Sequence, residues 1–161
     1  HPTGSRAAYM LPTWIGAMFF VLGERPGRSW LNLRFTAPAW LMWCGLAVLV
    51  ARLAYTWWAR VHLGRNWSAI VTLKEDHTLI QSGPYAITRH PIYTGILTAF
   101  VGTWLTYPTA GVLVGVLCFV LAFIIKLGQE ERLMIQTFGD AYRTYMTSVP
   151  GLVPRPGRRP G

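Results

Sequence analysis

The chain has 161 residues, of which 52% are hydrophobic and only 13% are charged, and its mean hydropathy is +0.32. Soluble domains carry about 25% charged residues, so the composition excludes an ordinary soluble protein and predicts one integral membrane domain over residues 1–161. The net charge of +9 does not indicate nucleic-acid binding, because the basic residues lie in loops and in the tail, where they suit anionic lipid headgroups.

Two apolar stretches precede the first long polar loop. Residues 9–23 are apolar but short of the ~20 residues that a membrane span needs. A short span, a re-entrant piece and the end of a truncated span all fit them, and a first residue of His1 rather than Met fits a fragment or a processed form. Residues 37–58 predict a full span, with Arg52 as its one charge and aromatic residues near its end.

Residues 59–90 form the longest polar segment and are predicted to be a cytoplasmic loop. Two short β-prone runs around a charged turn predict a hairpin over residues 71–80. Cys44 and Cys118 fall in separate apolar runs, so no disulfide is predicted, and no ligand spacing indicates a metal site.

Residues 91–126 contain two apolar runs separated only by a turn at Pro108, which predicts a tight helical hairpin. Small residues in these runs allow close helix approach in lipid or simply face the lipid; they are Gly95, Gly102, Gly111 and Gly115. Placing the polar loop and the C-terminal segment on one side collects most of the basic residues there, and this side is predicted to be cytoplasmic.

The last part of the chain changes character. Apolar residues recur at helical spacing among charged ones over residues 128–149, which predicts an amphipathic helical segment along the membrane surface. Gly139 is expected to end one helix within this segment, and Asp140 to cap the next. Residues 151–161 are rich in Pro, Gly and Arg and predict a flexible basic tail.

The polar motif GPYAITRHPIYTG spans residues 83–95 at the start of the hairpin. Pro91 suits the first position of a helix, where its missing N–H is no loss. The helix therefore begins next to Arg89 and His90, and its positive dipole end favours anions. The motif predicts an anion-binding corner at the membrane surface, although an ordinary helix start with snorkelling basic residues explains it about equally well.

Glu130 and Glu131 account for two of the six acidic residues and stand where the last span leaves the membrane. Adjacent helix positions point about 100° apart, so one carboxylate is expected to face inward and the other to lie along the surface. The hairpin returns both to the side of His90. A solvated acidic turn is the alternative, but acids at a membrane boundary are often functional.

The ordered set of GPY, RHPxYxG, a hairpin of spans, EE and FGxxYxxY resembles the isoprenylcysteine carboxyl methyltransferase family, with phospholipid N-methyltransferases as near relatives. The similarity covers roughly residues 58–150. It implies an all-α membrane protein of about four transmembrane helices, with a cytoplasmic cofactor pocket and a C-terminal amphipathic helix. It also implies a methyltransferase that uses S-adenosylmethionine.

The resemblance implies a role for each motif residue. Arg89 and His90, next to Pro91, suit the cofactor carboxylate, whereas Glu130 and Glu131 suit its ammonium or ribose. Tyr85 and Tyr93 stack, hydrogen-bond or simply anchor the chain at the interface. Family members often carry a basic residue before the final Val-Pro, where this chain has Ser148. Arg143 is the candidate to replace it in catalysis, with Glu130 as the other candidate catalytic residue; a headgroup contact is the alternative for Arg143.

The acceptor stays open at this point. An isoprenylcysteine-like carboxylate, a lipid amine and a small thiol all fit the family, and membrane lipids are the expected surroundings. Two other functions are alternatives: a membrane sterol-type reductase that uses NADPH, and a helical membrane scaffold without enzymatic activity. The reductase would require extra basic residues for the 2′-phosphate of NADPH, and no such cluster stands beside the motif. The scaffold would leave the group of Arg89, His90 and the two glutamates unexplained.

Overall fold

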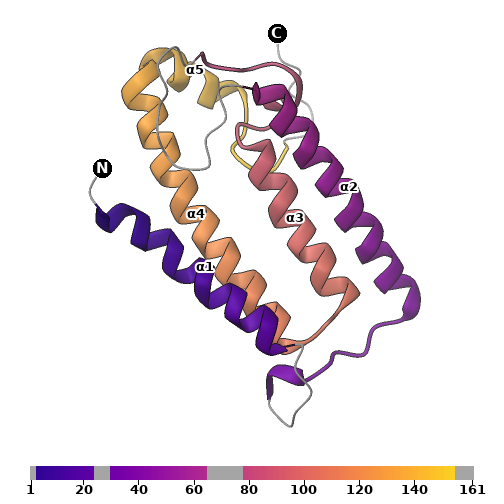
Figure 1. Ribbon diagram of the computed structural model, residues 1–161. Helices are drawn as coiled ribbons and strands as arrows, with labels where there is room; N and C mark the ends of the chain where they lie inside the picture. Colours follow the sequence, from indigo (N-terminus) through magenta and orange to yellow (C-terminus); the bar gives the residue numbers. More distant parts are fainter. Residues whose placement is uncertain (1–2, 24–29, 65–77, 155–161) are drawn as a thin grey trace.

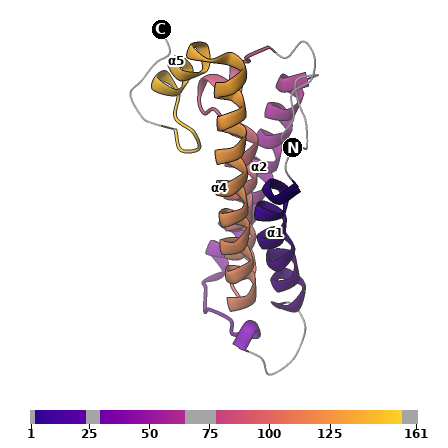
Figure 2. The ribbon, with the colours of Figure 1, turned by 90° about the vertical axis from the view of Figure 1, so that its left-hand side faces the viewer.

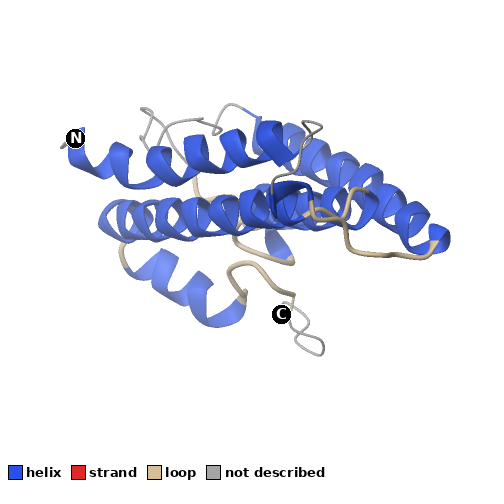
Figure 3. Ribbon diagram, turned by 90° about the horizontal axis from the view of Figure 1, so that it is seen from below, coloured by secondary structure: helices blue, strands red, loops and turns tan. Residues whose placement is uncertain are grey.

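The computed structural model describes residues 3–23, 30–64 and 78–154. Over these residues the regular elements are all helices (Figure 3). Four long helices run side by side, and a short fifth helix, α5 (Asp140–Ser148), lies across one end of them (Figures 1 and 2).

The long helices form two close pairs. Helix α1 (Thr3–Gly23) packs along α4 (Ala110–Phe138), and α2 (Ala39–Leu63) packs along α3 (Pro91–Thr106) (Figure 1). The contact between α3 and α4 is much less extensive and joins the two pairs.

Glycines set the distance within the α2–α3 pair. A Cβ atom added at Gly102 would lie 2.7 Å from the Gly45 carbonyl oxygen, and one added at Gly45 would lie 2.8 Å from the Gly102 carbonyl oxygen. A Cβ at Gly95 would collide with the Thr56 hydroxyl. The two backbones are therefore nearly in contact, as small residues permit in membrane helices.

Glycines also set the distance within the α1–α4 pair. A Cβ at Gly16 would lie 3.1 Å from the Gly115 carbonyl oxygen, and a Cβ at Gly115 would collide with the Phe20 ring. The close approach expected for Gly95, Gly102 and Gly115 is thus confirmed.

Loops close the end of the bundle opposite α5. The amide of Phe35 donates to the Pro108 carbonyl at 2.8 Å, and the amide of Ala110 donates to the Leu33 carbonyl at 3.0 Å. The Arg34 guanidinium donates to the Tyr107 hydroxyl at 2.8 Å. The segment before α2 is thereby tied to the turn between α3 and α4.

Two of the described helices are long and apolar enough to cross a membrane: Ala39–Leu63 and Ala110–Phe138. Large apolar side chains remain on the outer surface of α2, where Trp40, Trp43 and Trp57 are 65–71% exposed. Burying such groups is favourable in lipid and costly in water. The outer surface of the bundle therefore suits a lipid environment.

Helix limits differ from the sequence expectations at three places. Helix α1 begins at Thr3 rather than near residue 9, so the first helix has 21 residues. Helix α2 runs to Leu63, five residues past the expected span end at 58. Helix α4 continues without interruption to Phe138.

The expected surface segment 128–149 is therefore divided between two helices. Its first part is the end of α4, and only α5 is a separate short helix. Gly139 ends α4 with a φ of 52°, a left-handed conformation that costs glycine little. Gly139 is also the N-cap of α5, and Asp140 is its first residue and makes no side-chain cap.

Two expectations fall largely outside the described residues. The hairpin expected over residues 71–80 is described only from Thr78, and Thr78–Ile80 has no regular secondary structure. The basic tail is described only as far as residue 154.

Candidate active site

The motif before α3 folds as a compact turn. A short 3-10 helix, η3 (Gly83–Ala86), buries Pro84 and Tyr85, and α3 then begins at Pro91 in the first helical position, as predicted. His90 takes the N-cap position with φ −124° and ψ 61° and makes no side-chain cap.

The chain segment after α5 runs beneath this helix start. The amides of Arg89 and His90 and the hydroxyl of Thr94 donate to carbonyl groups of residues 150–152, at 2.9, 3.1 and 2.7 Å. Two amides beside the predicted anion-binding corner are therefore satisfied within the chain.

The Arg89 side chain joins three parts of the fold. Its Nη2 and Nε donate to Glu131 Oε1 at 2.6 and 3.0 Å, and its Nη1 donates to the carbonyls of Met146 and Val149 at 3.2 and 2.6 Å. These carbonyls lie at the C-terminal end of α5, where a cation is favourable. Arg89 thus clamps α5 onto α4 at the start of α3, and most of its donors are occupied.

The adjacent glutamates point to different partners, as the helix geometry predicts. Glu131 accepts from Arg89 and lies 3.2 Å from His90 Nε2. Glu130 accepts a hydrogen bond from the Tyr93 hydroxyl and lies 3.8 Å from His90 Nδ1. The imidazole of His90 therefore stands between both carboxylates, with its ring stacked on Tyr93 at 5.7 Å and 3°.

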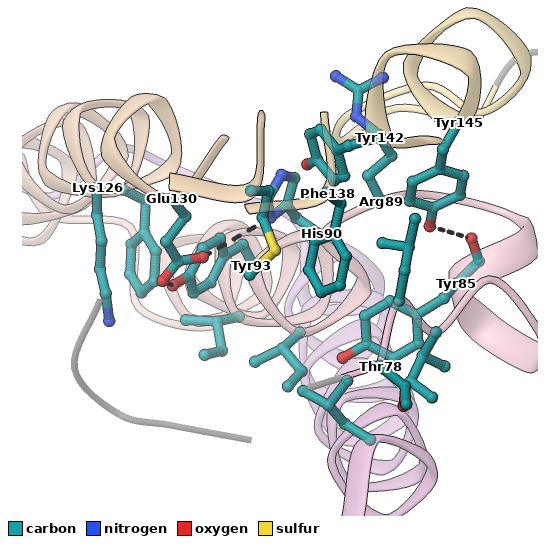
Figure 4. A pocket seen from close by; sticks show the side chains of 17 residues that line it. Thr78, Tyr85, Arg89, His90, Tyr93, Lys126, Glu130, Phe138, Tyr142 and Tyr145 are labelled. Carbon is teal, nitrogen blue, oxygen red and sulfur yellow. Dashed lines mark hydrogen bonds and ion pairs between the residues drawn. The ribbon is translucent and has the colours of Figure 1, made fainter. Parts of the chain in front are cut away.

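A cavity of about 300 Å³ opens beside this cluster. Figure 4 shows Lys126, Glu130 and Tyr93 at one end of it and Tyr85 and Tyr145 at the other. Glu130 lines the cavity, whereas Glu131 does not. The complete lining is Leu63, Thr78, Leu79, Ile80, Tyr85, Arg89, His90, Ile92, Tyr93, Ile96, Phe123, Lys126, Glu130, Met134, Phe138, Tyr142 and Tyr145.

Buried phenols form the other end of the cavity. The Tyr145 hydroxyl donates to the Tyr85 carbonyl at 2.5 Å and ties α5 to η3. Burial raises the pKa of Tyr142 to about 12 and raises the pKa values of Tyr85 and Tyr145 as well. These three side chains are neutral at physiological pH and offer aromatic surface and hydroxyl groups, but no charge.

The predicted site residues fall into three groups by their location relative to the cavity. Five line the cavity: Tyr85, Arg89, His90, Tyr93 and Glu130. Two do not line it: Glu131 is bound to Arg89, and Pro91 is the first residue of α3. Arg143 lies elsewhere: its side chain is 64% exposed, it is 3.8 Å from Asp140, and it does not line the cavity.

Sequence reasoning missed several lining residues. Lys126 lies one helical turn before Glu130, and its Nζ is 5.5 Å from the centre of the Tyr93 ring and 5.6 Å from that of Tyr9. The spacing from Glu130 was a signal for Lys126. Phe138, at the end of α4, enters the cavity only because α4 continues past its apolar part.

The chain matches a family profile and is similar to several known proteins. The profile of the isoprenylcysteine carboxyl methyltransferase (ICMT) family matches residues 43–136. The chain is 35% identical to the protein-S-isoprenylcysteine O-methyltransferase of Schizosaccharomyces pombe over 102 residues, 60% of this chain and 42% of that protein. It is 40% identical to the methanethiol S-methyltransferase of Pseudomonas deceptionensis over 78 residues, 48% of this chain and 29% of that protein.

The fold also resembles a solved structure, that of the eukaryotic intramembrane Ras methyltransferase ICMT. The TM-score is 0.57 at 22% sequence identity, over 96% of this chain and 53% of that one. The matches thus span only 29–53% of the length of these three proteins. At this identity the structural likeness speaks for the fold alone.

Proposed function

Since the chain belongs to the isoprenylcysteine carboxyl methyltransferase family, we propose that it is a membrane methyltransferase that takes its methyl group from S-adenosylmethionine. The cavity beside His90, Tyr93 and Glu130 is the proposed cofactor site. The acceptor is a lipophilic or small molecule that meets the cofactor at the membrane boundary.

The observation that most supports this function is that Glu130 and Glu131 contact different partners. Glu131 is occupied with Arg89 and His90, while Glu130 turns its carboxylate into the cavity and is fixed there by the Tyr93 hydroxyl. A carboxylate held at a mostly apolar wall suits a ligand with positive charge, and S-adenosylmethionine carries an ammonium and a sulfonium. When bound, the cofactor supplies an electrophilic methyl group on a positively charged sulfur.

The rest of the lining suits the remaining parts of such a ligand. His90 and Arg89 offer N–H groups for a carboxylate, and the aromatic rings of Tyr85, Phe138 and Tyr142 offer stacking surface for a base. The volume of about 300 Å³ lies at the lower end of the range for small-molecule sites. These residues position the ligand and exclude water, which a methyl transfer needs more than acid–base groups.

We place all four long helices across the membrane, with the cavity on the cytoplasmic side. Helices α2 and α4 have the length and composition of spans, and α1 and α3 are each paired with one of them. Arg60 is in the last turn of α2, Arg89 comes just before α3, and Arg132 is in the last part of α4, all toward the end of the bundle that carries α5, whereas Arg34 lies at the opposite end. This excess of basic residues favours the cytoplasm for the α5 end under the positive-inside rule.

The test is methyl transfer by the purified full chain in lipid nanodiscs. Methyl-labelled S-adenosylmethionine is supplied with an S-isoprenylcysteine, with methanethiol or with a lipid amine, and labelled product is measured. We expect transfer to at least one acceptor, a loss of at least tenfold in Glu130→Gln, and little change in Arg132→Gln, an exposed neighbour that does not line the cavity.

Two results would contradict the proposal. One is wild-type turnover in Glu130→Gln, which would remove the cofactor from this cavity. The other is the absence of any transfer together with oxidation of NADPH in the presence of a sterol, which would favour the reductase.

A further inference from the structure

Arg52 is a charged residue near the middle of α2, one of the two helices that are long and apolar enough to cross a membrane. The sequence predicts a span that ends at residue 58, but α2 continues to Leu63. Arg52 therefore lies 13 residues after Ala39, the first residue of the helix, and 11 before the last. A charge in such a segment is costly unless it is neutralised, so its counter-charge is a question of function.

The packing of α2 on α3 shows how deep Arg52 lies. A Cβ atom added at Gly95 would be 3.1 Å from the Arg52 carbonyl oxygen, so these two residues are at the same level. Gly95 is four residues after Pro91, where α3 begins, which is about 6 Å along the helix axis. An arginine side chain is long enough to bring its charge across that distance to the membrane surface.

The guanidinium of Arg52 is the first member of a row of side chains on α2. The Arg52 side chain is exposed, and its guanidinium carbon lies over the Tyr55 ring, 5.9 Å from the ring centre. Tyr55 makes an edge contact with the ring of Trp58, with the ring centres 5.9 Å apart, and Trp58 is 48% exposed. These three residues, the Arg52–Trp58 row, follow one another at steps of three residues toward the α5 end of the bundle.

The charge of Arg52 is not neutralised within the described ranges. All three acidic residues of those ranges lie in α4 or α5, and each is within ion-pair distance of another basic side chain. In the same part of the chain, the Tyr55 ring is the group on which the guanidinium rests. A guanidinium has five N–H donors, and those of Arg52 are open to a ligand from the lipid side.

We propose that the Arg52–Trp58 row binds the headgroup of an anionic phospholipid, with the lipid phosphate on the Arg52 guanidinium. The row does not line the proposed cofactor cavity, so this lipid is a bound neighbour of the helix and neither the cofactor nor the methyl acceptor. The inference does not depend on the proposed methyltransferase function.

The chemistry of the row suits a lipid phosphate. A guanidinium presents its donors as a planar fork that matches two phosphate oxygens at once. Tyr55 and Trp58 combine an apolar ring with a polar hydroxyl or N–H group, a combination that suits the boundary between headgroups and acyl chains. In the other direction, the same face of α2 continues with the apolar residues Val48 and Cys44, four and eight residues before Arg52, so acyl chains have an apolar surface to lie on.

The net charge of the headgroup decides which phospholipid binds. In phosphatidylglycerol the phosphate charge is not compensated, so the pair with Arg52 is neutral. Phosphatidylcholine brings its own ammonium, which already balances its phosphate and would stand near the guanidinium, where like charges repel in a poorly hydrated environment. An inorganic phosphate ion has the charge but lacks the acyl chains that hold a lipid at this depth.

The binding test counts lipids on the purified full chain by native mass spectrometry, during titration with dioctanoyl phosphatidylglycerol in neutral detergent micelles. Wild type should retain one lipid per chain at saturation. Arg52→Leu should weaken this binding about tenfold, the equivalent of one charge-assisted hydrogen-bonded contact. Arg52→Lys keeps the charge without the fork and should fall between the two.

The matched control is Arg132→Leu, which removes the same charge at an exposed position toward the α5 end and should leave lipid binding nearly unchanged. The Arg52 side chain is exposed, so Arg52→Leu should fold, and an unchanged thermal midpoint without added lipid checks this. Lipid binding that is unchanged in Arg52→Leu, or reduced equally in Arg132→Leu, would overturn the proposal.

Three further outcomes identify the ligand. Dioctanoyl phosphatidylglycerol should raise the thermal midpoint of wild type and not that of Arg52→Leu, whereas dioctanoyl phosphatidylcholine and inorganic phosphate should raise neither. An equal rise with inorganic phosphate would assign Arg52 to soluble anions, and equal retention of phosphatidylcholine would refute the charge selection. A wild-type dimer that disappears in Arg52→Leu would mean that a second copy covers Arg52, which also contradicts the proposal. Failure of S-adenosylhomocysteine to bind wild type would refute the proposed function and leave the lipid site standing.

Discussion

The two adjacent glutamates should separate stability from ligand binding. Glu131 accepts two hydrogen bonds from Arg89, at 2.6 and 3.0 Å, and the two side chains are only 16% and 10% exposed. Removing one partner of a buried ion pair costs about 3–5 kcal/mol, because the other charge stays buried without compensation. Glutamine keeps the shape of Glu131 and some water reaches the pair, so Glu131→Gln should lower the free energy of unfolding by about 3 kcal/mol.

Glu130→Gln should lower the ligand affinity strongly and the stability only slightly. The side chain at this position still accepts the Tyr93 hydrogen bond, so the loss of unfolding free energy should be about 1 kcal/mol. The cavity loses its fixed negative charge, however, and S-adenosylhomocysteine, which keeps the ammonium, should bind at least tenfold more weakly. In Glu131→Gln the loss of affinity should be smaller, because that carboxylate does not line the cavity.

Unfolding is measured by tryptophan fluorescence during denaturation in mixed micelles, and binding by calorimetry on the folded protein. Arg132→Gln, at an exposed position beside the pair, should change stability by less than about 0.5 kcal/mol. A stability loss in Glu131→Gln no larger than that of this control would refute the stabilising role of the Arg89–Glu131 ion pair. A weaker binding of S-adenosylhomocysteine in Glu131→Gln than in Glu130→Gln would refute the assignment of ligand binding to Glu130.

Three further substitutions test the helix packing and the fold of the site. Gly102→Ala should destabilise the protein by about 1–3 kcal/mol, because its Cβ would lie 2.7 Å from the Gly45 carbonyl oxygen. Gly128→Ala should stabilise it by about 0.5–1 kcal/mol, because a Cβ at that position has no neighbour within 4 Å. The midpoint of denaturation measures both changes. Tyr145→Phe should cost about 1–3 kcal/mol by leaving the buried Tyr85 carbonyl without its 2.5 Å donor, and it should speed hydrogen exchange in α5.

Much of the site could be predicted from local rules. Pro91 fixed the start of α3, and the helical angle between adjacent residues predicted that Glu130 and Glu131 would take different partners. The turn at Pro108 indicated that both motifs return to one end of the bundle. The first two inferences need only the near neighbours of a residue in the sequence, and the third needs only the lengths of the two apolar runs around the turn.

Helix limits were harder, because an apolar run and a helix do not end for the same reason. Apolarity falls after Lys126, yet no residue breaks the helix before Gly139, so α4 continues to Phe138. Residues 3–8 are similarly helical although they are less apolar than the stretch that follows. The sequence pattern reports contact with lipid, whereas backbone hydrogen bonding decides the helix limit.

The meeting of Arg89 and His90 with the two glutamates was expected from the hairpin, but the contacts of Arg89 with the backbone were beyond sequence reasoning. Arg89 also donates to carbonyls at the end of α5, and backbone acceptors carry no signature in the sequence. Arg143 was a candidate because of its residue type, but its side chain lies outside the cavity on α5. Lys126 resembles an ordinary basic residue at the end of a span until α1 and α3 bring Tyr9 and Tyr93 beside it.

The most direct test of the account is a pair of titrations of the purified wild-type chain in nanodiscs, one with S-adenosylhomocysteine and one with NADPH. The account predicts saturable binding of one S-adenosylhomocysteine per chain, protection of the cavity residues Tyr85 and His90 from chemical modification, and no measurable binding of NADPH. Binding of NADPH, or no binding of S-adenosylhomocysteine to a folded chain, would contradict it.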